Sequence, residues 1–256
     1  MIPTITQEQK DTLNEQGFFV LENVFSTEDM ERLGSVIQDF QRRHQEQLEL
    51  DKAANLAADG SNISRANEIT FTSHLAEHSD AIREFCTRPE FVAITTDLLG
   101  PDIDLYWNQS VFKAPEGEKE FPWHQDDGYT AVDPSPYLTL WIALNDATAE
   151  NGCISAMPGS HKNGLVEHTP SPIGLVCHSS DDPDQGVLVP VKAGSIAVFW
   201  SLTFHKSGVN RSKGMRKAFI AQYAHAGLRK VEDGELIPDL IAVARNGQPA
   251  LLVAAA

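Results

Sequence analysis

A histidine and an aspartate stand two residues apart in the segment PWHQD at residues 122–126. Side chains at positions i and i+2 of an extended backbone point to the same face, so His124 and Asp126 can reach one point in space. A second histidine, His205, follows the apolar run at residues 196–200. Two histidines and one carboxylate that leave coordination positions open form the facial triad of non-haem Fe(II) oxygenases. These three residues are a candidate metal site; the alternative is a surface turn at residues 126–128, which needs no metal.

A basic stretch follows the second histidine in a chain whose net charge is −16. If Fe(II) is bound, its open positions can take a bidentate 2-oxo acid and then O2, and a dicarboxylate co-substrate needs a cation for its far end. Arg216 suits that task, because a guanidinium grips a carboxylate through two parallel hydrogen bonds and stays charged at any working pH. The other interpretation, a solvated basic turn, is preferred for Arg211, Lys213 and Lys217.

The composition limits the class of protein. A length of 256 residues fits one large domain, so we expect a single domain over residues 1–256. The charge of −16 disfavours nucleic acid and anionic membranes as partners and favours solubility. Three scattered cysteines, without a Cys-x-x-Cys spacing, predict free thiols in a reducing compartment. No apolar run is long enough for a membrane span and no leader pattern is present, so we expect a cytoplasmic protein.

The first hundred residues are predicted to be mostly helical. Residues 6–16 fit a helix that ends at Gly17, and residues 18–21 fit a short strand. Ser26 with Asp29 three positions later resembles a capping box, and apolar residues recur behind it at helical spacing. Further helices are expected at residues 79–86 and 89–99. Residues 51–67 lack periodicity and are predicted to be a long loop, either a lid or a disordered segment.

Short strands are predicted after Pro101. The expected ranges are 103–113, 137–144, 153–157, 187–191, 195–200 and 218–223, separated by turn signals that contain glycine. This pattern predicts a mainly β protein with flanking helices: a double-stranded β-helix, or cupin-like jelly roll, at about residues 101–226. The helical part at about residues 1–100 would pack outside it, and residues 227–256 would form a C-terminal extension. Residues 169–185 are a second candidate lid.

Six ordered blocks of sequence resemble the phytanoyl-CoA dioxygenase family of Fe(II)- and 2-oxoglutarate-dependent oxygenases. They cover about residues 105–225, and the segment before them matches only in style. The blocks are FKAP at 112–115, PWHQD at 122–126, LWIAL at 140–144, ENGC at 150–153, MPGSHK at 157–162, and HKSGVNRS at 205–212 with Arg216.

The resemblance implies a site as well as a fold. His124, Asp126 and His205 would bind the iron, and Arg216, helped by Ser207, would bind the far carboxylate of 2-oxoglutarate. Three further positions fall where family members line the co-substrate pocket: Gln109, Gln125 and Trp141. His161 belongs to a turn that looks like a structural feature of the family, and we do not expect it to be a ligand.

The resemblance also implies a reaction. Oxidative decarboxylation of 2-oxoglutarate with O2 would release succinate and CO2 and oxidise a C–H bond, most often by hydroxylation. Related halogenases lack the metal carboxylate, so Asp126 argues against halogenation, while cyclisation, desaturation and epoxide formation stay open. A small metabolite or natural-product intermediate is the expected substrate. The alternatives are a metal-dependent cupin-like hydrolase or isomerase, and a catalytically silent binding protein on the same scaffold.

Overall fold

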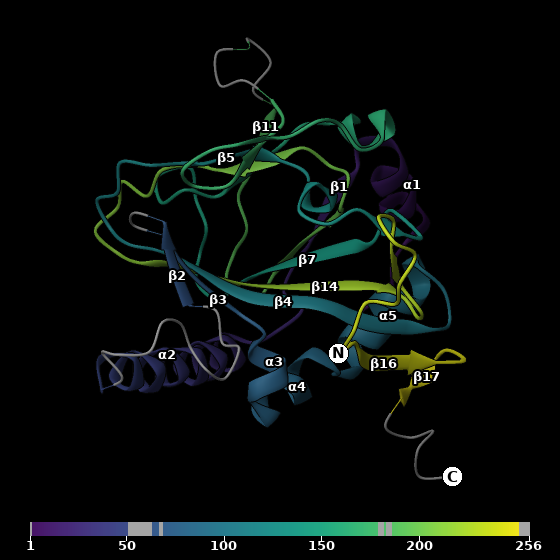
Figure 1. Cartoon of the computed structure of the whole chain (residues 1–256), viewed down its shortest axis with the longest axis horizontal. Helices are drawn as coiled ribbons and strands as arrows, with labels where there is room; N and C mark the ends of the chain where they lie inside the picture. Colours follow the sequence, from purple (N-terminus) through teal and green to yellow (C-terminus); the bar gives the residue numbers. More distant parts are fainter. Residues whose placement is uncertain (1, 51–62, 67–68, 179–181, 183–185, 251–256) are drawn as a thin grey trace.

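The computed structural model describes residues 2–50, 63–66, 69–178, 182 and 186–250. Within those residues the chain is mostly antiparallel β-sheet, with most of the helices against one side and the first helix beside the first strand (Figure 1). The described part holds no helix with the length and apolar character needed to cross a membrane. The helices are α1 (Gln7–Gln16), α2 (Thr27–Leu50), α3 (Leu75–His78), α4 (Asp80–Cys86) and α5 (Pro89–Leu98).

The major sheet has the strand order β1-β12-β7-β14-β4-β16-β17. In addition, β3 pairs with β4, and β2 pairs with β3. All of its pairings are antiparallel. The bounds are β1 (Phe18–Leu21), β2 (Ile63–Ala66), β3 (Ile69–Ser73), β4 (Ile103–Lys113), β7 (Leu138–Ala143), β12 (Ile196–Trp200), β14 (Arg216–His225), β16 (Ile241–Arg245) and β17 (Gln248–Pro249).

A minor sheet lies on the other side of the major one, away from α2, α3 and α4 (Figure 1). Its order is β11-β8-β13-β5, and two further pairs and two 3-10 helices complete the described elements. This arrangement confirms the predicted jelly-roll class with helices outside the core. The bounds are β5 (Phe121–His124), β8 (Ile154–Ala156), β11 (Val187–Val189), β13 (His205–Ser207), β6 (Val132–Asp133) with β15 (Arg229–Lys230), β9 (Thr169–Pro170) with β10 (Leu175–Val176), η1 (Asp126–Gly128) and η2 (Ser160–Asn163).

The N-terminal helices begin and end where local chemistry predicts. Thr6 caps α1 in a reciprocal capping box with Gln9, and Gly17 ends the helix at φ 90°, a left-handed conformation that glycine adopts without strain. At the start of α2, the Asp29 amide donates to Ser26 Oγ at 3.1 Å and Ser26 Oγ donates to the Asp29 carboxylate at 3.0 Å. The predicted apolar face of α2 is buried in the main core.

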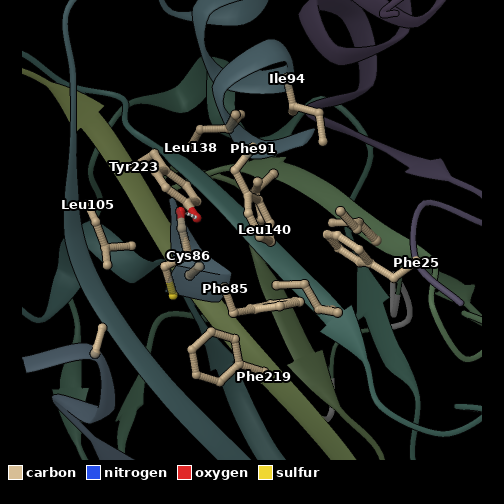
Figure 2. Close-up of a cluster of buried hydrophobic side chains, with 14 of the residues drawn as sticks. Phe25, Phe85, Cys86, Phe91, Ile94, Leu105, Leu138, Leu140, Phe219 and Tyr223 are labelled. Carbon is tan, nitrogen blue, oxygen red and sulfur yellow. Dashed lines mark hydrogen bonds between the residues drawn. The ribbon is translucent and has the colours of Figure 1, made fainter. Parts of the chain in front are cut away.

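Side chains alternate between the two faces of the central strands, so the major sheet has a buried interior on each side. Leu140 on β7 and Phe219 and Tyr223 on β14 face the helices, where they pack with Phe85 and Phe91 (Figure 2). The Tyr223 hydroxyl donates to the Cys86 carbonyl at 2.8 Å and joins α4 to the sheet. Residues at the intervening positions face the minor sheet instead. The helices therefore stiffen one face of a sheet whose other face is available for a site.

The structure departs from the predicted layout at both ends of the chain. The part predicted to be mostly helical, about residues 1–100, supplies β2 and β3 as well as the predicted strand β1, and the C-terminal extension supplies β16 and β17 to the same sheet. β3 and β16 pair with β4, while β2 pairs with β3 and β17 with β16. Hydrogen bonds to β4, a distant part of the chain, stabilise β3 and β16 more than local pattern does. Of the predicted loop at 51–67, residues 63–66 form β2, while residues 51–62 and 67 lie outside the described residues.

The turn at Gly152 lies against the chain that follows β13. Gly152 has φ +82°, and an added Cβ would overlap the carbonyl group of Gly208. That carbonyl also accepts a hydrogen bond from the buried ammonium of Lys113 on β4, as does the Ser207 carbonyl at 2.9 Å. The close approach at Gly152 thus helps to join the two sheets.

We expect Gly152→Ala to lower stability by about 1–3 kcal/mol, because alanine strains the left-handed backbone and pushes Gly208 away. For a domain of this size that is a drop in Tm of roughly 2–4 °C for each kcal/mol. Thermal unfolding followed by circular dichroism measures the change. Gly214→Ala is the matched control, since nothing lies within 4 Å of an added Cβ there. Equal Tm values for the two variants would contradict this account.

Candidate metal centre

The two histidines and the aspartate converge between the sheets. His124 ends β5 and pairs with His205 of β13 across the minor sheet. Asp126 opens η1, and its Oδ1 lies 3.8 Å from His124 Nε2 and 3.6 Å from His205 Nε2. The three ligand atoms lie within 4.8 Å of one another. Such a cluster of two imidazoles and one carboxylate fits one divalent metal ion bound on a single face.

Both imidazoles are oriented by the backbone. His124 Nδ1 lies 2.9 Å from the Pro122 carbonyl, and His205 Nδ1 lies 2.9 Å from the Thr203 carbonyl. A carbonyl only accepts, so each Nδ1 carries the proton and each Nε2 lone pair faces the other ligands. Burial holds the pKa of His124 well below its usual value, with the neighbouring His205 adding to the effect. The neutral imidazole that a metal needs is therefore the stable form.

The carboxylate of Asp126 is oriented by the major sheet. Thr139 on β7 donates from Oγ1 to Asp126 Oδ2 at 2.6 Å, and Gln222 on β14 donates to Thr139 Oγ1 at 3.3 Å. The Asp126 backbone N–H donates a hydrogen bond to the Ser201 carbonyl at 2.9 Å, and this bond anchors the start of η1. One carboxylate oxygen is thus occupied by Thr139, and the oxygen nearer the histidines remains for a metal.

Gln125 does not reach the site, although the sequence predicted it in the co-substrate pocket. Its amide group donates to the Gly164 and Leu202 carbonyls, each at 2.8 Å, and accepts from the Val166 amide at 2.9 Å. The same alternation that turns His124 and Asp126 inward turns the residue between them outward. The backbone N–H of Gln125 donates a hydrogen bond to His168 Nε2 at 3.0 Å. Gln125 therefore supports the backbone between the two ligands.

Arg216, at the start of β14, is fully buried. No acceptor among the described residues takes a hydrogen bond from its Nε, Nη1 or Nη2, and its guanidinium carbon lies 5.2 Å from the Trp141 ring centroid. Burial lowers the pKa of Arg216 to about 10, so the group stays charged at neutral pH. A buried cation without an anion costs several kcal/mol, and an anionic ligand would remove that cost.

One cavity of about 560 Å³ connects the triad with Arg216. The predicted co-substrate residues Gln109, Trp141 and Ser207 all line it, in addition to the four residues above. His161 is elsewhere: its Nε2 lies 3.1 Å from the Asn14 carbonyl at the end of α1. Of the other basic residues, Arg211 and Lys213 are exposed, as a solvated turn requires.

Two groups of functional residues were missed from the sequence. Thr139 lies in a correctly predicted strand two positions before Trp141, so alternation alone would have placed it on the same face. The cavity also takes Pro172, Ile173 and Gly174 from the turn between β9 and β10, inside the predicted lid at 169–185. Residues 179–181 and 183–185 of that lid lie outside the described residues. The local sequence pattern does not indicate which part of such a segment contacts the cavity.

We expect Thr139→Val to weaken Fe(II) binding by about 10- to 100-fold, because removing a hydrogen-bond partner of a metal ligand typically has that effect. Anaerobic titration with Fe(II), followed by calorimetry, measures the Kd. Thr139→Ser keeps the hydroxyl and is expected to bind Fe(II) like the parent chain. If valine and serine variants bind Fe(II) equally well, Thr139 does not position Asp126.

Solved structures show the same fold. The crystal structure of the non-haem alpha ketoglutarate dependent carbocyclase SnoK from nogalamycin biosynthesis matches with a TM-score of 0.75 at 22% identity, over 94% of this chain and 97% of that one. EvdO2 from Micromonospora carbonacea var. aurantiaca, complexed with 2-oxoglutarate, matches with a TM-score of 0.67 at 20% identity, over 93% and 98%.

Sequence comparison identifies the family. The peroxisomal phytanoyl-CoA dioxygenase of Bos taurus is 25% identical over 239 residues, which are 89% of this chain and 71% of that protein. A probable alpha-ketoglutarate-dependent hypophosphite dioxygenase of Stutzerimonas stutzeri is 27% identical over 234 residues, 86% and 78%. The family model described as phytanoyl-CoA dioxygenase matches residues 13–218. The chain belongs to the phytanoyl-CoA dioxygenase family and, as a member, is an iron- and 2-oxoglutarate-dependent dioxygenase.

Proposed function

We propose that the chain hydroxylates a C–H bond of a small molecule at the His124–Asp126–His205 centre, with release of succinate and CO2. The observation that carries this proposal is the buried, unpartnered guanidinium of Arg216 in the same cavity as the triad. A metal site alone would suit many reactions. A metal site with a buried cation at the far end of its cavity suits a dicarboxylate that reaches both.

Each residue has a defined task in this proposal. His124 and His205 bind Fe(II) through Nε2, and Asp126 binds it through Oδ1, while Thr139 keeps the carboxylate in place. Arg216 binds the far carboxylate of 2-oxoglutarate, Ser207 assists it, and Gln109 and Trp141 form the walls. Gln125, which does not face the cavity, has no part in binding. Bound iron supplies the coupled oxidation of 2-oxoglutarate and of the substrate C–H bond by O2.

Asp126 supports hydroxylation over halogenation. Its carboxylate faces both imidazoles and so takes the coordination position that a halide would need. The triad would hold a metal through three positions, and the cavity that it lines would leave space for co-substrate and substrate to bind next to each other.

We further propose that residues 1–256 act as one domain in a reducing, cytoplasmic compartment and do not bind nucleic acid or membranes. Strands from both ends of the chain share the major sheet, which supports a single domain. Cys86, Cys153 and Cys177 are free thiols, which supports the compartment. The net charge of −16 repels polyanions and anionic lipids.

Anaerobic addition of Fe(II) and 2-oxoglutarate is the direct test. The proposed site should produce a weak metal-to-ligand absorption band in the visible, and air should then release succinate slowly even without a prime substrate. Omission of either component should abolish the band. Absence of a band with both components present would overturn the proposed function.

We expect Asp126→Ala to lower Fe(II) affinity and succinate release by more than about 100-fold, since a direct ligand contributes more than the outer partners for which 10- to 100-fold is typical. Calorimetric Fe(II) titration and succinate assay measure the two effects. Asp133→Asn changes an exposed acid of β6 and should alter neither. Retention of Fe(II) binding by the alanine variant would remove Asp126 from the ligand set.

We expect Arg216→Ala to raise the Kd for 2-oxoglutarate by roughly 30-fold or more, because truncating one partner of a buried charged pair costs about 2–5 kcal/mol. Fe(II) affinity should stay the same. Arg216→Lys keeps the charge without the two-pronged hydrogen bonding and should fall in between. The exposed Arg211→Ala is the control. The anaerobic absorption band, titrated with 2-oxoglutarate, provides the Kd, and an unchanged value for the alanine variant would contradict the role of Arg216.

A further inference from the structure

We propose that the prime substrate is an uncharged molecule with an aromatic ring system, bound between the aromatic walls that surround the metal triad. This inference rests on the proposed function and narrows it to a class of substrate. Its basis is the juxtaposition, in one cavity, of six aromatic side chains with charged groups that already have partners or assigned ligands.

The aromatic residues are concentrated at this cavity. Three of the chain's four tyrosines line it, together with two phenylalanines and a tryptophan. Phe199, whose ring lies 4.6 Å from that of His205, and Trp141 of the proposed co-substrate end line it as well. Many of their rings meet edge to face. Tyr106 and Tyr137 lie 5.0 Å apart at 69°, and Phe121 lies 4.8 Å from the His124 ring at 84°. Aromatic rings stack on or meet other rings in these geometries, so such walls favour a flat ring over a flexible chain. The six residues are Phe71, Tyr106, Trp107, Phe121, Tyr129 and Tyr137.

The register of the major sheet separates this region from the co-substrate. Along β14, Arg216, Ile220 and Gln222 all line the cavity, and they mark successive levels of it. Ile220 pairs with Gln109 and Trp141, whereas Gln222 pairs with Trp107 and Thr139. Thr139 holds Asp126, so the metal lies near the level of Gln222. The co-substrate would then span the levels between Arg216 and the metal, and Trp107 lies at the metal's end of that span, away from Arg216.

The charges of the metal centre and its co-substrate balance one another, so no counter-charge remains for a charged substrate. The two charges of Fe(II) and the one of Arg216 balance those of Asp126 and the two carboxylates of 2-oxoglutarate. The one other charged side chain among the described lining residues is Lys206, whose ammonium lies 3.2 Å from Glu120 Oε2 and 5.3 Å from the Trp123 ring centroid. Burial raises the pKa of Tyr129 to about 12 and also raises those of Tyr106 and Tyr137, so the three phenols are neutral. A charged substrate would lose its hydration here without gaining a counter-charge.

The turn at residues 171–174, called the roof below, contributes to the cavity lining and is uncharged too. The turn Ser171–Gly174 lies over it, and Gly174 is packed so closely that an added Cβ would come within 2.7 Å of Tyr129 Oη and 2.8 Å of Phe121 Cζ. The Leu175 amide donates to Tyr129 Oη at 3.2 Å. Pro172 and Ile173 are the apolar side chains that this turn contributes to the cavity lining.

The test uses four probes on the anaerobic protein loaded with Fe(II) and 2-oxoglutarate: 2-naphthol, 2-naphthoate, octan-1-ol and octanoyl-coenzyme A. Their Kd values come from the change in the visible absorption band and from tryptophan fluorescence. We expect 2-naphthol to bind at least about tenfold more tightly than 2-naphthoate, because only the anion loses hydration without a partner. It should also bind at least about threefold more tightly than octan-1-ol, because ring contacts add to buried area.

Two variants locate the binding. Trp107→Leu should raise the Kd for 2-naphthol by about threefold or more without changing the absorption band. Trp200→Leu, which changes a tryptophan outside the cavity lining, should leave that Kd unchanged. Ile173→Lys adds a cation to the roof and should raise the affinity for 2-naphthoate by at least about tenfold. Leu165→Lys places the same charge at an exposed site outside the lining and should have no effect.

Equal or tighter binding of 2-naphthoate, octan-1-ol or octanoyl-coenzyme A by the parent chain would overturn the inference. So would unchanged naphthoate binding by Ile173→Lys. Failure of the absorption band to form would overturn the proposed function instead, and fluorescence titration of the metal-free protein with 2-naphthol would then show whether the aromatic site exists without it.

Discussion

A guanidinium buried without an anion is the constraint around which the site is organised. Arg216 begins β14, the strand at the centre of the major sheet, where helices cover one face and the minor sheet covers the other. Its side chain has no solvent-exposed surface, and no described residue accepts a hydrogen bond from its guanidinium. Its neighbour in register, Lys113, is equally buried but donates to two backbone carbonyls. The difference between these two cations separates a structural role from a binding role.

The two sheets contribute different parts of the centre. The minor sheet carries both histidines, and backbone carbonyls set the tautomer of each. The major sheet carries Thr139, which donates to the Asp126 carboxylate, Gln222, which donates to Thr139, and Arg216, the residue proposed to bind the co-substrate. Because the helical core stiffens the major sheet from behind (Figure 2), these side chains are held on a rigid element. The cavity walls combine side chains from the middle of β4, such as Tyr106 and Trp107, with others from strand ends and turns, such as Phe121, Tyr129 and Ile173. At strand ends and turns, substitution alters a substrate pocket at least cost to the fold.

Several predictions from sequence were right for reasons that can be stated. The ranges of β4, β7 and β12 followed from β-rich runs between turn signals. The range of α1 followed from a helix-compatible run that ends at Gly17, and the start of α2 followed from the Ser26–Asp29 capping box. Gln125 was placed wrongly because family resemblance was given more weight than alternation, which turns that residue outward. The short strands β3, β13 and β16 have little local signal, because their stability comes from pairing with partners far along the chain.

The sequence by itself determined the chemistry of the centre and its family. His124 and Asp126 are two residues apart on an extended segment, so local geometry alone brings them together, and ordered motifs identify His205 and Arg216 beside them. Only the tertiary structure decided what surrounds them. The cross-strand register placed Thr139 on Asp126 and Trp107 at the same level of the sheet, and the β9–β10 turn brought Ile173 into the cavity lining from a distant part of the chain. Side-chain spacing is a local property, whereas enclosure of a cavity depends on long-range pairing that one sequence does not encode in any short window.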